Sequence, residues 1–306
     1  MNFSLTRLRE ILPQLDLILF DVDGVLLDTS RSFPLAIVRA VRDYGRYVLG
    51  VSWRPPRLRE VAAFKEVPGF NNDWDLVKGC LLFFLQQTFR PHPAALSQFL
   101  EEVSALGGGL QGCEKWLSGL PAPERNAVAS RYHPPAIQQL AMEHYAGKEY
   151  CFRFYGVEPQ YGVQEGTLVF ERPLADLKKL RRLTQQLGIY TGRNPGELEV
   201  ALEKIGFSGW NPEIIFLDDG NTPKKPDPEP LLAAARRTQA RALLFVGDTY
   251  DDFQTVQNLK SAAPDLPAVF VQVRNDARTA VFGAVPVVSH VNELLDFLVS
   301  ETAADR

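Results

Sequence analysis

Acidic residues stand directly after two short apolar runs of the chain, where they could bind a cation. Asp21 and Asp23 follow the run that ends at Phe20, and a second group spans Asp248 to Asp252 after another run. Carboxylates this close oppose each other's ionisation unless they share a cation. Mg²⁺ is the natural partner, because it prefers oxygen ligands, and the two groups together could complete an octahedral site that neither would hold tightly alone. The two groups together therefore predict a Mg²⁺ site.

A hydroxyl group and a lysine could hold an anion nearby. Thr191 and Gly192 follow the apolar run 187–190 and lead into a helix expected to begin at Pro195. A hydroxyl beside backbone N–H groups at the start of a helix is a common arrangement for holding phosphate. One lysine of the pair Lys224 and Lys225 precedes another predicted helix and can offer a fixed positive charge. The combination indicates a site for a phosphate group beside the cation.

The runs that carry these residues predict a parallel sheet. They are short and continuously apolar, as expected for strands buried on both faces. Predicted strands cover 17–20, 187–190, 214–217, 243–246, 269–273 and 285–288. Predicted helices between them cover 174–187, 195–205, 228–237 and 251–259. This alternation is typical of an α/β fold with a doubly wound sheet, in which ligands bind at the carboxyl ends of the strands.

One long region interrupts the alternation. After residue 20 the next convincing strand begins near residue 187, and the residues between favour helices. Apolar residues recur at helical spacing over 38–48, and further helices are predicted over 75–88, 93–106 and 134–145. We therefore expect residues 1–30 and 166–306 to form the α/β core and residues 31–165 to form an inserted helical domain. The insert is long, and we expect the part that enlarges it to lie around residues 90–135, where Pro93, the glycines 107–109 and Pro121 cluster.

Composition narrows the class of protein. The chain has 306 residues, 45% of them apolar and 23% charged, with a net charge of −4. These values exclude wholesale disorder and give no reason to expect nucleic acid or an anionic membrane as a partner. No apolar stretch approaches the ~20 residues that span a bilayer, and the first residues lack the apolar segment of a signal peptide. Three scattered cysteines fit buried, reduced thiols, so we expect a cytoplasmic protein.

The ordered set of motifs resembles the haloacid dehalogenase (HAD) superfamily. The matching segments are 21–25 (DVDGV), 191–193 (TGR), 225–228 (KPDP) and 247–252 (GDTYDD). The resemblance covers roughly residues 14–30 and 166–290 and implies a Rossmann-like core. The helical insert is similar to the cap domain of subfamily I members that resemble phosphoglycolate phosphatase.

The resemblance implies a role for each matching residue. Asp21 would be the nucleophile that attacks phosphorus and becomes an aspartyl phosphate. Asp23 would protonate the leaving oxygen and then deprotonate the hydrolytic water. Thr191 and the backbone N–H of Gly192 would hold the transferring phosphoryl group, and Lys225 would neutralise its developing charge.

The resemblance also implies a set of metal ligands. Asp21, the backbone carbonyl of Asp23, and Asp248 would bind Mg²⁺, and Asp252 would orient these ligands or bound water. The family spacing favours Asp252 over its neighbour Asp251 for the last of these roles.

Asp23 separates the reaction classes of the superfamily. Dehalogenases and phosphonate-cleaving members lack an acid at this position, whereas phosphatases and phosphomutases have one. The expected function is therefore a Mg²⁺-dependent phosphatase that hydrolyses a small phosphorylated metabolite, and the enzyme would be a monomer or a homodimer. A phosphomutase is the alternative. A non-catalytic HAD-like binding protein is a further one, although binding alone would not need a nucleophile beside an acid.

One segment of the insert could contact the substrate. Residues 64–75 are rich in polar side chains bracketed by aromatic ones, as binding loops often are. They resemble a segment in a bacterial branch of helical-cap HAD hydrolases. Lys65, Asn72 and Trp74 are the candidates for closing over substrate. Two structural roles are equally compatible with the pattern, because Asn72 could cap the following helix and Trp74 could belong to the core.

Overall fold

The chain folds into two compact units that divide it discontinuously. The structure is a computed structural model that describes residues 6–70, 72–275 and 280–304. The first unit combines residues 1–29 with 172–306, and the second consists of residues 30–171. The domain boundaries expected from the sequence fall after residues 30 and 165. Residues 166–171 lie with the second unit because the 3₁₀ helix η3 (Thr167–Phe170) packs on two helices of that unit.

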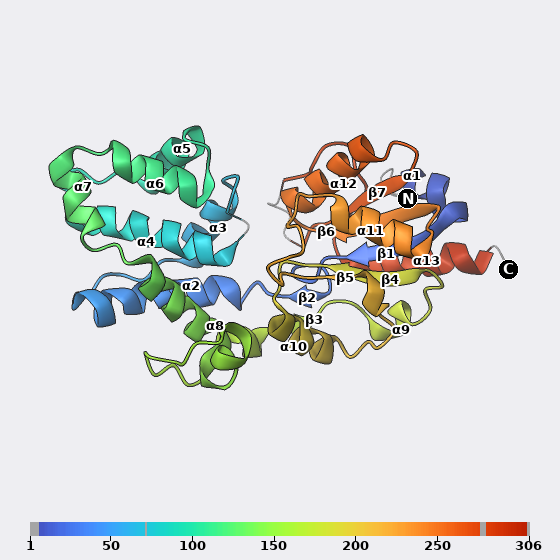
Figure 1. Cartoon of the computed structure of the whole chain (residues 1–306), viewed down its shortest axis with the longest axis horizontal. Coiled ribbons are helices and arrows are strands. Elements are labelled where there is room, and N and C mark those ends of the chain that lie inside the picture. The colour runs from blue at the N-terminus through green and yellow to red at the C-terminus, as the bar shows by residue number, and fades with distance from the viewer. Residues whose placement is uncertain (1–5, 71, 276–279, 305–306) are drawn as a thin grey trace. The chain divides into compact units, whose positions relative to one another are not determined.

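A six-stranded parallel sheet forms the centre of the first unit (Figure 1). Its strands are β1 (Leu15–Phe20), β4 (Gln186–Tyr190), β5 (Ile215–Phe216), β6 (Ala242–Gly247), β7 (Ala268–Val273) and β8 (Val287–Val288). Their order across the sheet is β5-β4-β1-β6-β7-β8, and all neighbours are parallel. Each strand overlaps one of the predicted runs. The strand order reverses at β1, which lies between β4 and β6.

Apolar side chains cover both faces of this sheet. On β1, Ile18 and Phe20 belong to one buried cluster, and Leu17 and Leu19 belong to the other. The first cluster includes residues of α1 (Thr6–Ile11), α9 (Leu177–Leu180), α10 (Pro195–Ile205) and α13 (Val291–Ala304). The second includes residues of α11 (Glu229–Thr238) and α12 (Tyr250–Ala262). Helices on both faces confirm the predicted Rossmann-like, doubly wound α/β fold.

The prediction of one long helix over residues 174–187 was wrong. Only α9 is helical there, and β4 already begins at Gln186. The leucines of this stretch, Leu174, Leu177, Leu180 and Leu183, are spaced three apart and pack on the first sheet cluster. A short helix followed by turns satisfies this spacing as well as a continuous α-helix does.

A second, two-stranded sheet lies where the chain leaves and re-enters the first unit. Strand β2 (Leu27–Asp28) pairs antiparallel with β3 (Arg172–Pro173). Leu27 lies opposite Pro173, and Asp28 lies opposite Arg172. The two ends of the insert are therefore held side by side in the first unit, although 143 residues separate Asp28 from Arg172 in the chain.

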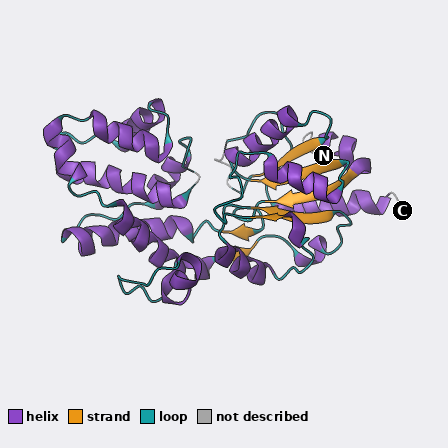
Figure 2. Cartoon of the chain, in the orientation of Figure 1, coloured by secondary structure: helices purple, strands orange, loops and turns teal. Residues whose placement is uncertain are grey.

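Among the described residues of the second unit, the regular secondary structure is helical, and loops join the helices (Figure 2). Its helices are α2 (Phe33–Tyr44), the π-helix η2 (Gly45–Leu49), α3 (Leu58–Lys65), α4 (Asp73–Phe89), α5 (Leu96–Ala105), α6 (Gly109–Gly119), α7 (Ala122–Ala129), α8 (Pro134–Tyr155) and η3. They bury their own apolar cluster, in which Phe64, Phe83 and Phe99 are in mutual ring contact. This unit has a core independent of the sheet.

Helix α8 extends ten residues beyond its predicted end at Tyr145. Gly147 interrupts it with φ 66° and ψ −176°, a conformation that only glycine adopts readily. A side chain on Gly147 would meet the backbone of Gly166 at 2.5 Å, so the returning chain packs closely here.

Two further expectations concern membrane-spanning helices and the state of the cysteines. Within residues 6–70, 72–275 and 280–304, no helix is both long and apolar enough to cross a bilayer. The three cysteines, Cys80, Cys113 and Cys151, are buried and free, as expected.

Candidate active site

The predicted site residues gather at the carboxyl edge of the parallel sheet. Asp21 follows β1, Thr191 follows β4, and Asp248 follows β6. These three strands are adjacent, so residues distant in sequence meet at one edge. The backbone N–H of Asp21 donates to the carbonyl of Val246 at 2.8 Å, which continues the β1–β6 pairing to the site itself.

Lys225 joins two of the carboxylates. Its Nζ lies 2.9 Å from Oδ1 of Asp21 and 2.6 Å from Oδ1 of Asp252. All three side chains are largely buried. Burial raises the pKa of Asp21 to about 7, the positive charge of Lys225 opposes this rise, and the nearby carboxylates of Asp252 and Asp23 add to it. For Lys225 the two carboxylates outweigh burial and hold its pKa above the usual range, so the ammonium stays charged.

Three carboxylates could hold a metal ion. One oxygen each from Asp21, Asp248 and Asp252 lie within 4.8 Å of one another. Gly24 brings Asp248 close to the loop after β1, because it has φ +70° and a Cβ there would lie 2.1 Å from Oδ2 of Asp248. Carboxylate oxygens held this closely suit a hard divalent cation.

Asp252 has a structural role as well. Its side chain is completely buried, and its Oδ2 accepts hydrogen bonds from the backbone N–H (3.0 Å) and Oγ1 (2.7 Å) of Thr249. The Thr249 side chain caps α12 in return, which forms a reciprocal capping box. The other oxygen of Asp252 contacts Lys225. Both oxygens of Asp252 thus have protein donors, and its role beside a metal ion stays a prediction.

Asp23 faces a different cation. Its Oδ1 accepts hydrogen bonds from Nε (3.0 Å) and Nη2 (2.6 Å) of Arg193. The Arg193 side chain is 1% exposed, whereas that of Asp23 is 33% exposed. Sequence reasoning placed Arg193 in a motif but gave it no role. The available signal was its position at a predicted strand end beside Thr191, where a buried guanidinium needs an acidic partner.

Thr191 and Gly192 form the turn between β4 and α10. Thr191 is buried, its N–H donates to the carbonyl of Phe216 at 3.0 Å, and its Oγ1 accepts from the N–H of Arg193 at 3.3 Å. Gly192 is exposed, and no atom lies within 4 Å of the position that a side chain would take. The turn thus presents open backbone beside a buried hydroxyl.

The candidates from the insert lie in the second unit. Lys65 pairs with Asp73 at 3.0 Å. Asn72 caps α4 by accepting from the backbone N–H of Trp74 (2.9 Å) and Asp75 (3.2 Å). The ring of Trp74 packs edge-on against three aromatic rings, those of Phe33, Tyr145 and Tyr155. The capping and packing roles considered for Asn72 and Trp74 are thus present, and contact of the three residues with substrate stays a prediction.

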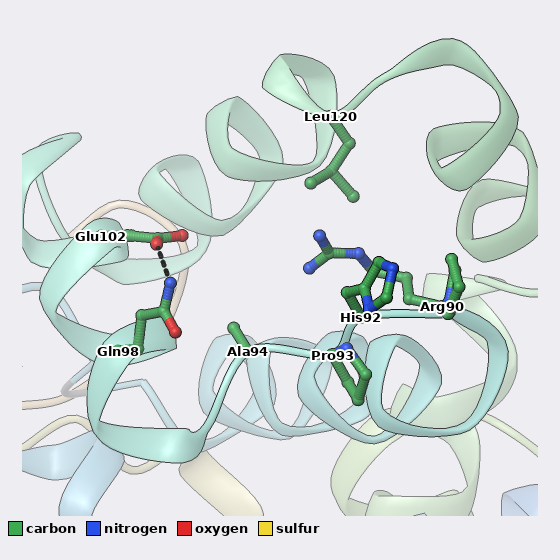
Figure 3. Close-up of a pocket in the computed structure, with 8 residues that line it drawn as sticks. Arg90, His92, Pro93, Ala94, Gln98, Glu102 and Leu120 are labelled. Atoms are coloured by element: carbon green, nitrogen blue, oxygen red, sulfur yellow. Dashed lines mark hydrogen bonds between the residues drawn. The ribbon is translucent and has the colours of Figure 1, made fainter.

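A separate cavity of about 500 Å³ lies in the second unit, within the segment expected to enlarge the insert (Figure 3). Arg90 and Glu102 are its charged lining residues. Nε of Arg90 donates to Glu124 at 2.6 Å, and Glu102 accepts from Gln98 at 2.8 Å and from Trp116 at 2.6 Å. These charges are engaged with protein partners, and the cavity shares no residue with the acidic cluster.

Known proteins resemble parts or the whole of this chain. It is 27% identical over 142 residues to N-acetylmuramic acid 6-phosphate phosphatase of Pseudomonas aeruginosa, covering 44% of this chain and 61% of that protein. It is 32% identical over 107 residues to phosphoglycolate phosphatase of Salmonella typhimurium, covering 34% and 40%. The matched regions thus span less than two thirds of these relatives.

Similarity of fold extends over nearly the whole chain. The structure of phosphatase Tt82 from Thermococcus thioreducens superposes with a TM-score of 0.63 at 24% identity, covering 93% of this chain and 99% of the other. At family level, the model for haloacid dehalogenase-like hydrolases matches residues 15–259, which include Asp21, Thr191, Lys225 and Asp248. With the sheet, the acidic cluster and the helical insert in place, the chain belongs to the haloacid dehalogenase-like hydrolases.

Proposed function

We propose that this protein is a Mg²⁺-dependent phosphatase that hydrolyses a small phosphorylated metabolite through an aspartyl-phosphate intermediate. The observation that carries the proposal is the separation of the two carboxylates after β1. Asp21 is buried against Lys225, and Asp23 is more exposed and held by Arg193. Two carboxylates in different environments can take different roles in one reaction, one as nucleophile and the other as acid and base.

Asp21 is the proposed nucleophile. In the first step one of its carboxylate oxygens forms a bond to phosphorus as the bond from phosphorus to the ester oxygen breaks. Lys225, 2.9 Å from Asp21, lies where it can offset the negative charge of the phosphoryl oxygens. Thr191 and the N–H of Gly192 are proposed to hold those oxygens in line with Asp21.

Asp23 is the proposed acid and base. It donates a proton to the leaving ester oxygen, which departs as an alcohol. In the second step it accepts a proton from the water that attacks the aspartyl phosphate, which regenerates Asp21 and releases inorganic phosphate. Arg193 fixes the carboxylate by two hydrogen bonds to one oxygen, so the second oxygen can face the substrate.

Asp21, Asp248 and the backbone carbonyl of Asp23 are the proposed Mg²⁺ ligands. When bound, the ion would offset the charge between the Asp21 carboxylate and the phosphate dianion. Asp252 orients this arrangement through its contacts with Lys225 and the turn at Thr249.

The names of the relatives support a small substrate. Two of the relatives are named for N-acetylmuramic acid 6-phosphate and phosphoglycolate, and both names specify small phosphorylated metabolites. Buried, free cysteines support the cytoplasm as the place of action.

The test is a phosphate-release screen over a panel of phosphorylated metabolites. We expect Asp21→Asn to lower kcat by a factor of roughly 10³ or more, because the amide cannot act as the nucleophile. The matched control is Asp16→Asn, since Asp16 lies on the same strand β1 and pairs with Arg241 at the surface. Retained turnover in Asp21→Asn would sink the mechanism. A requirement for a bisphosphate activator, with transfer of the phosphoryl group back to a sugar, would identify a phosphomutase instead.

A further inference from the structure

Tyr190 connects the strand that precedes Thr191 to the loop that carries Lys225. It is the last residue of β4, and its side chain is buried. Its hydroxyl lies 2.9 Å from the carbonyl oxygen of Pro223 and 3.3 Å from that of Asp227. These two carbonyls flank Lys225, so the one hydroxyl hydrogen, donated to Pro223 or shared with Asp227, ties Tyr190 to the loop that carries the lysine.

The ring of Tyr190 lies close to the charge of the same lysine. Nζ of Lys225 is 5.3 Å from the centroid of this ring and 5.4 Å from that of Phe245 on β6. A cation within about 6 Å of an aromatic face is attracted to it, more strongly in a desolvated site. The two rings and the two carboxylates, Asp21 and Asp252, together define the position of the ammonium group.

The hydroxyl of Tyr190 is suited to act as a donor. Burial raises the pKa of the Tyr190 phenol above its usual range, although the charge of Lys225 opposes this rise. The group therefore stays protonated and can donate to a carbonyl. A second side chain holds the loop from α12, where Nδ2 of Asn258 donates to the carbonyl of Pro226 at 2.9 Å.

We propose that Tyr190 is a positioning residue for Lys225, acting through the loop 223–227 by its hydroxyl and on the ammonium group by its ring. This inference rests on the proposed function, in which Lys225 offsets phosphoryl charge. Packing alone does not need the hydroxyl, because a phenylalanine would fill the same space between Phe216 and Phe245.

Two substitutions separate the hydroxyl from the ring. Tyr190→Phe keeps the ring and removes the hydrogen bonds, and we expect kcat to fall about fivefold to tenfold with KM nearly unchanged. Tyr190→Leu removes both contacts and should lower kcat further. Tyr44→Phe is the matched control: the Tyr44 hydroxyl also donates to a backbone carbonyl, that of Arg131 at 2.7 Å, but within the helical unit, and its loss should leave kcat unchanged.

A double-mutant cycle distinguishes positioning from a general effect on folding. If Tyr190 acts through Lys225, Tyr190→Phe should cause no further loss of kcat in a Lys225→Met background, measured by single turnover. An equal fold-loss in both backgrounds, or a wild-type kcat in Tyr190→Phe, would overturn the inference.

A readout without catalysis keeps this inference separable from the proposed function. The amide of Asp227 donates to the carbonyl of Lys224 at 2.9 Å. Tyr190→Phe should speed hydrogen exchange across 224–227, while exchange in β4 stays slow. Absence of phosphate release by the wild type refutes the proposed function, whereas unchanged exchange over 224–227 in Tyr190→Phe refutes the role of Tyr190.

Discussion

Arg193 and Arg241 make the same kind of contact in different places. Each guanidinium donates through Nε and Nη2 to an aspartate. Asp23, the partner of Arg193, follows the carboxyl end of β1, and Asp16, the partner of Arg241, lies near its amino end. The Arg193 pair with Asp23 has a buried guanidinium at the candidate site, and the Arg241 pair with Asp16 is exposed at the opposite end. Exposed ion pairs contribute little to stability, whereas a buried guanidinium holds its partner carboxylate in one orientation.

The first prediction concerns this buried pair. Arg193→Met should lower kcat about tenfold to a hundredfold, because Asp23 loses two charge-assisted hydrogen bonds that orient it. Steady-state phosphate release measures the change, and Arg241→Met is the control, because Arg241 pairs with Asp16 through the same two nitrogens at an exposed position. Equal activity in both variants would show that the orientation of Asp23 does not depend on Arg193.

At the scale of single residues, the sequence predicted which site residues lie together. It did not predict every side chain that holds them in place. Asp21, Thr191 and Asp248 follow recognisable strands, so their convergence follows from the parallel sheet. The roles of Arg193 and Tyr190 were not predicted, because their hydrogen-bond partners lie far away in sequence and no periodic pattern marks such a contact. Their roles depend on distances of about 3 Å, which local patterns do not encode.

Helix α4 begins at a cap that the sequence anticipated. Asn72 accepts two backbone hydrogen bonds there. Asn72→Ala should reduce the free energy of unfolding by ~1 kcal/mol, and Asn72→Asp should restore most of it. Urea unfolding checks the cap, and KM checks contact with substrate. A raised KM in both variants would assign Asn72 to binding, whereas unchanged stability in Asn72→Ala would contradict the capping role.

Helices α2 and α8 share a buried histidine–aspartate contact. Nε2 of His144 lies 2.9 Å from Oδ2 of Asp43, which also pairs with Arg42. Burial lowers the pKa of His144 from 6.5 to about 4, despite the attraction of Asp43. The unfolded chain therefore binds a proton here more readily than the folded protein. The contribution of neutral His144 should be complete above pH 6.5 and lost as pH falls from 6.5 towards 4, by on the order of 3 kcal/mol.

Tryptophan fluorescence can follow this change in the helical unit. Three of the four tryptophans, Trp53, Trp74 and Trp116, lie there, and Trp210→Phe removes the fourth. In that background, urea unfolding at several pH values should show the decline, and His144→Gln should reduce it. His92→Gln, at an exposed site, should leave the decline in place. An identical pH dependence in His144→Gln and its parent would exclude this histidine as the cause.

At the scale of helices and strands, the spacing of apolar residues predicts some elements and misses others. Long, strongly patterned segments such as α10 and the buried strands were predicted closely. Strands β2 and β3 have two residues each, too few to show any alternation. Helix α8 continues past Gly147, because the chain resumes helical geometry after this one residue. A prediction that ends a helix at a glycine cannot anticipate this.

For the whole molecule, metal binding should be visible in both stability and turnover. EDTA should abolish phosphate release and Mg²⁺ should restore it, and Mg²⁺ should also raise Tm, since a ligand that binds only the folded state stabilises it. Asp248→Asn should lose the Tm response, whereas Asp251→Asn, outside the carboxylate cluster, should keep it. Undiminished turnover after complete chelation would contradict the metal assignment.

The pairing of β1 has a consequence for the order of synthesis. This strand occupies the middle of the sheet, but Leu17 pairs with Gln186 and Leu243, so both neighbours emerge from the ribosome after the entire helical unit. At ordinary rates of translation the first neighbour follows about ten to thirty seconds later. The helical unit, with its own core, can fold during that delay. The apolar segment 15–20 cannot pair during that delay, so the nascent chain carries it as an unpaired segment until β4 arrives.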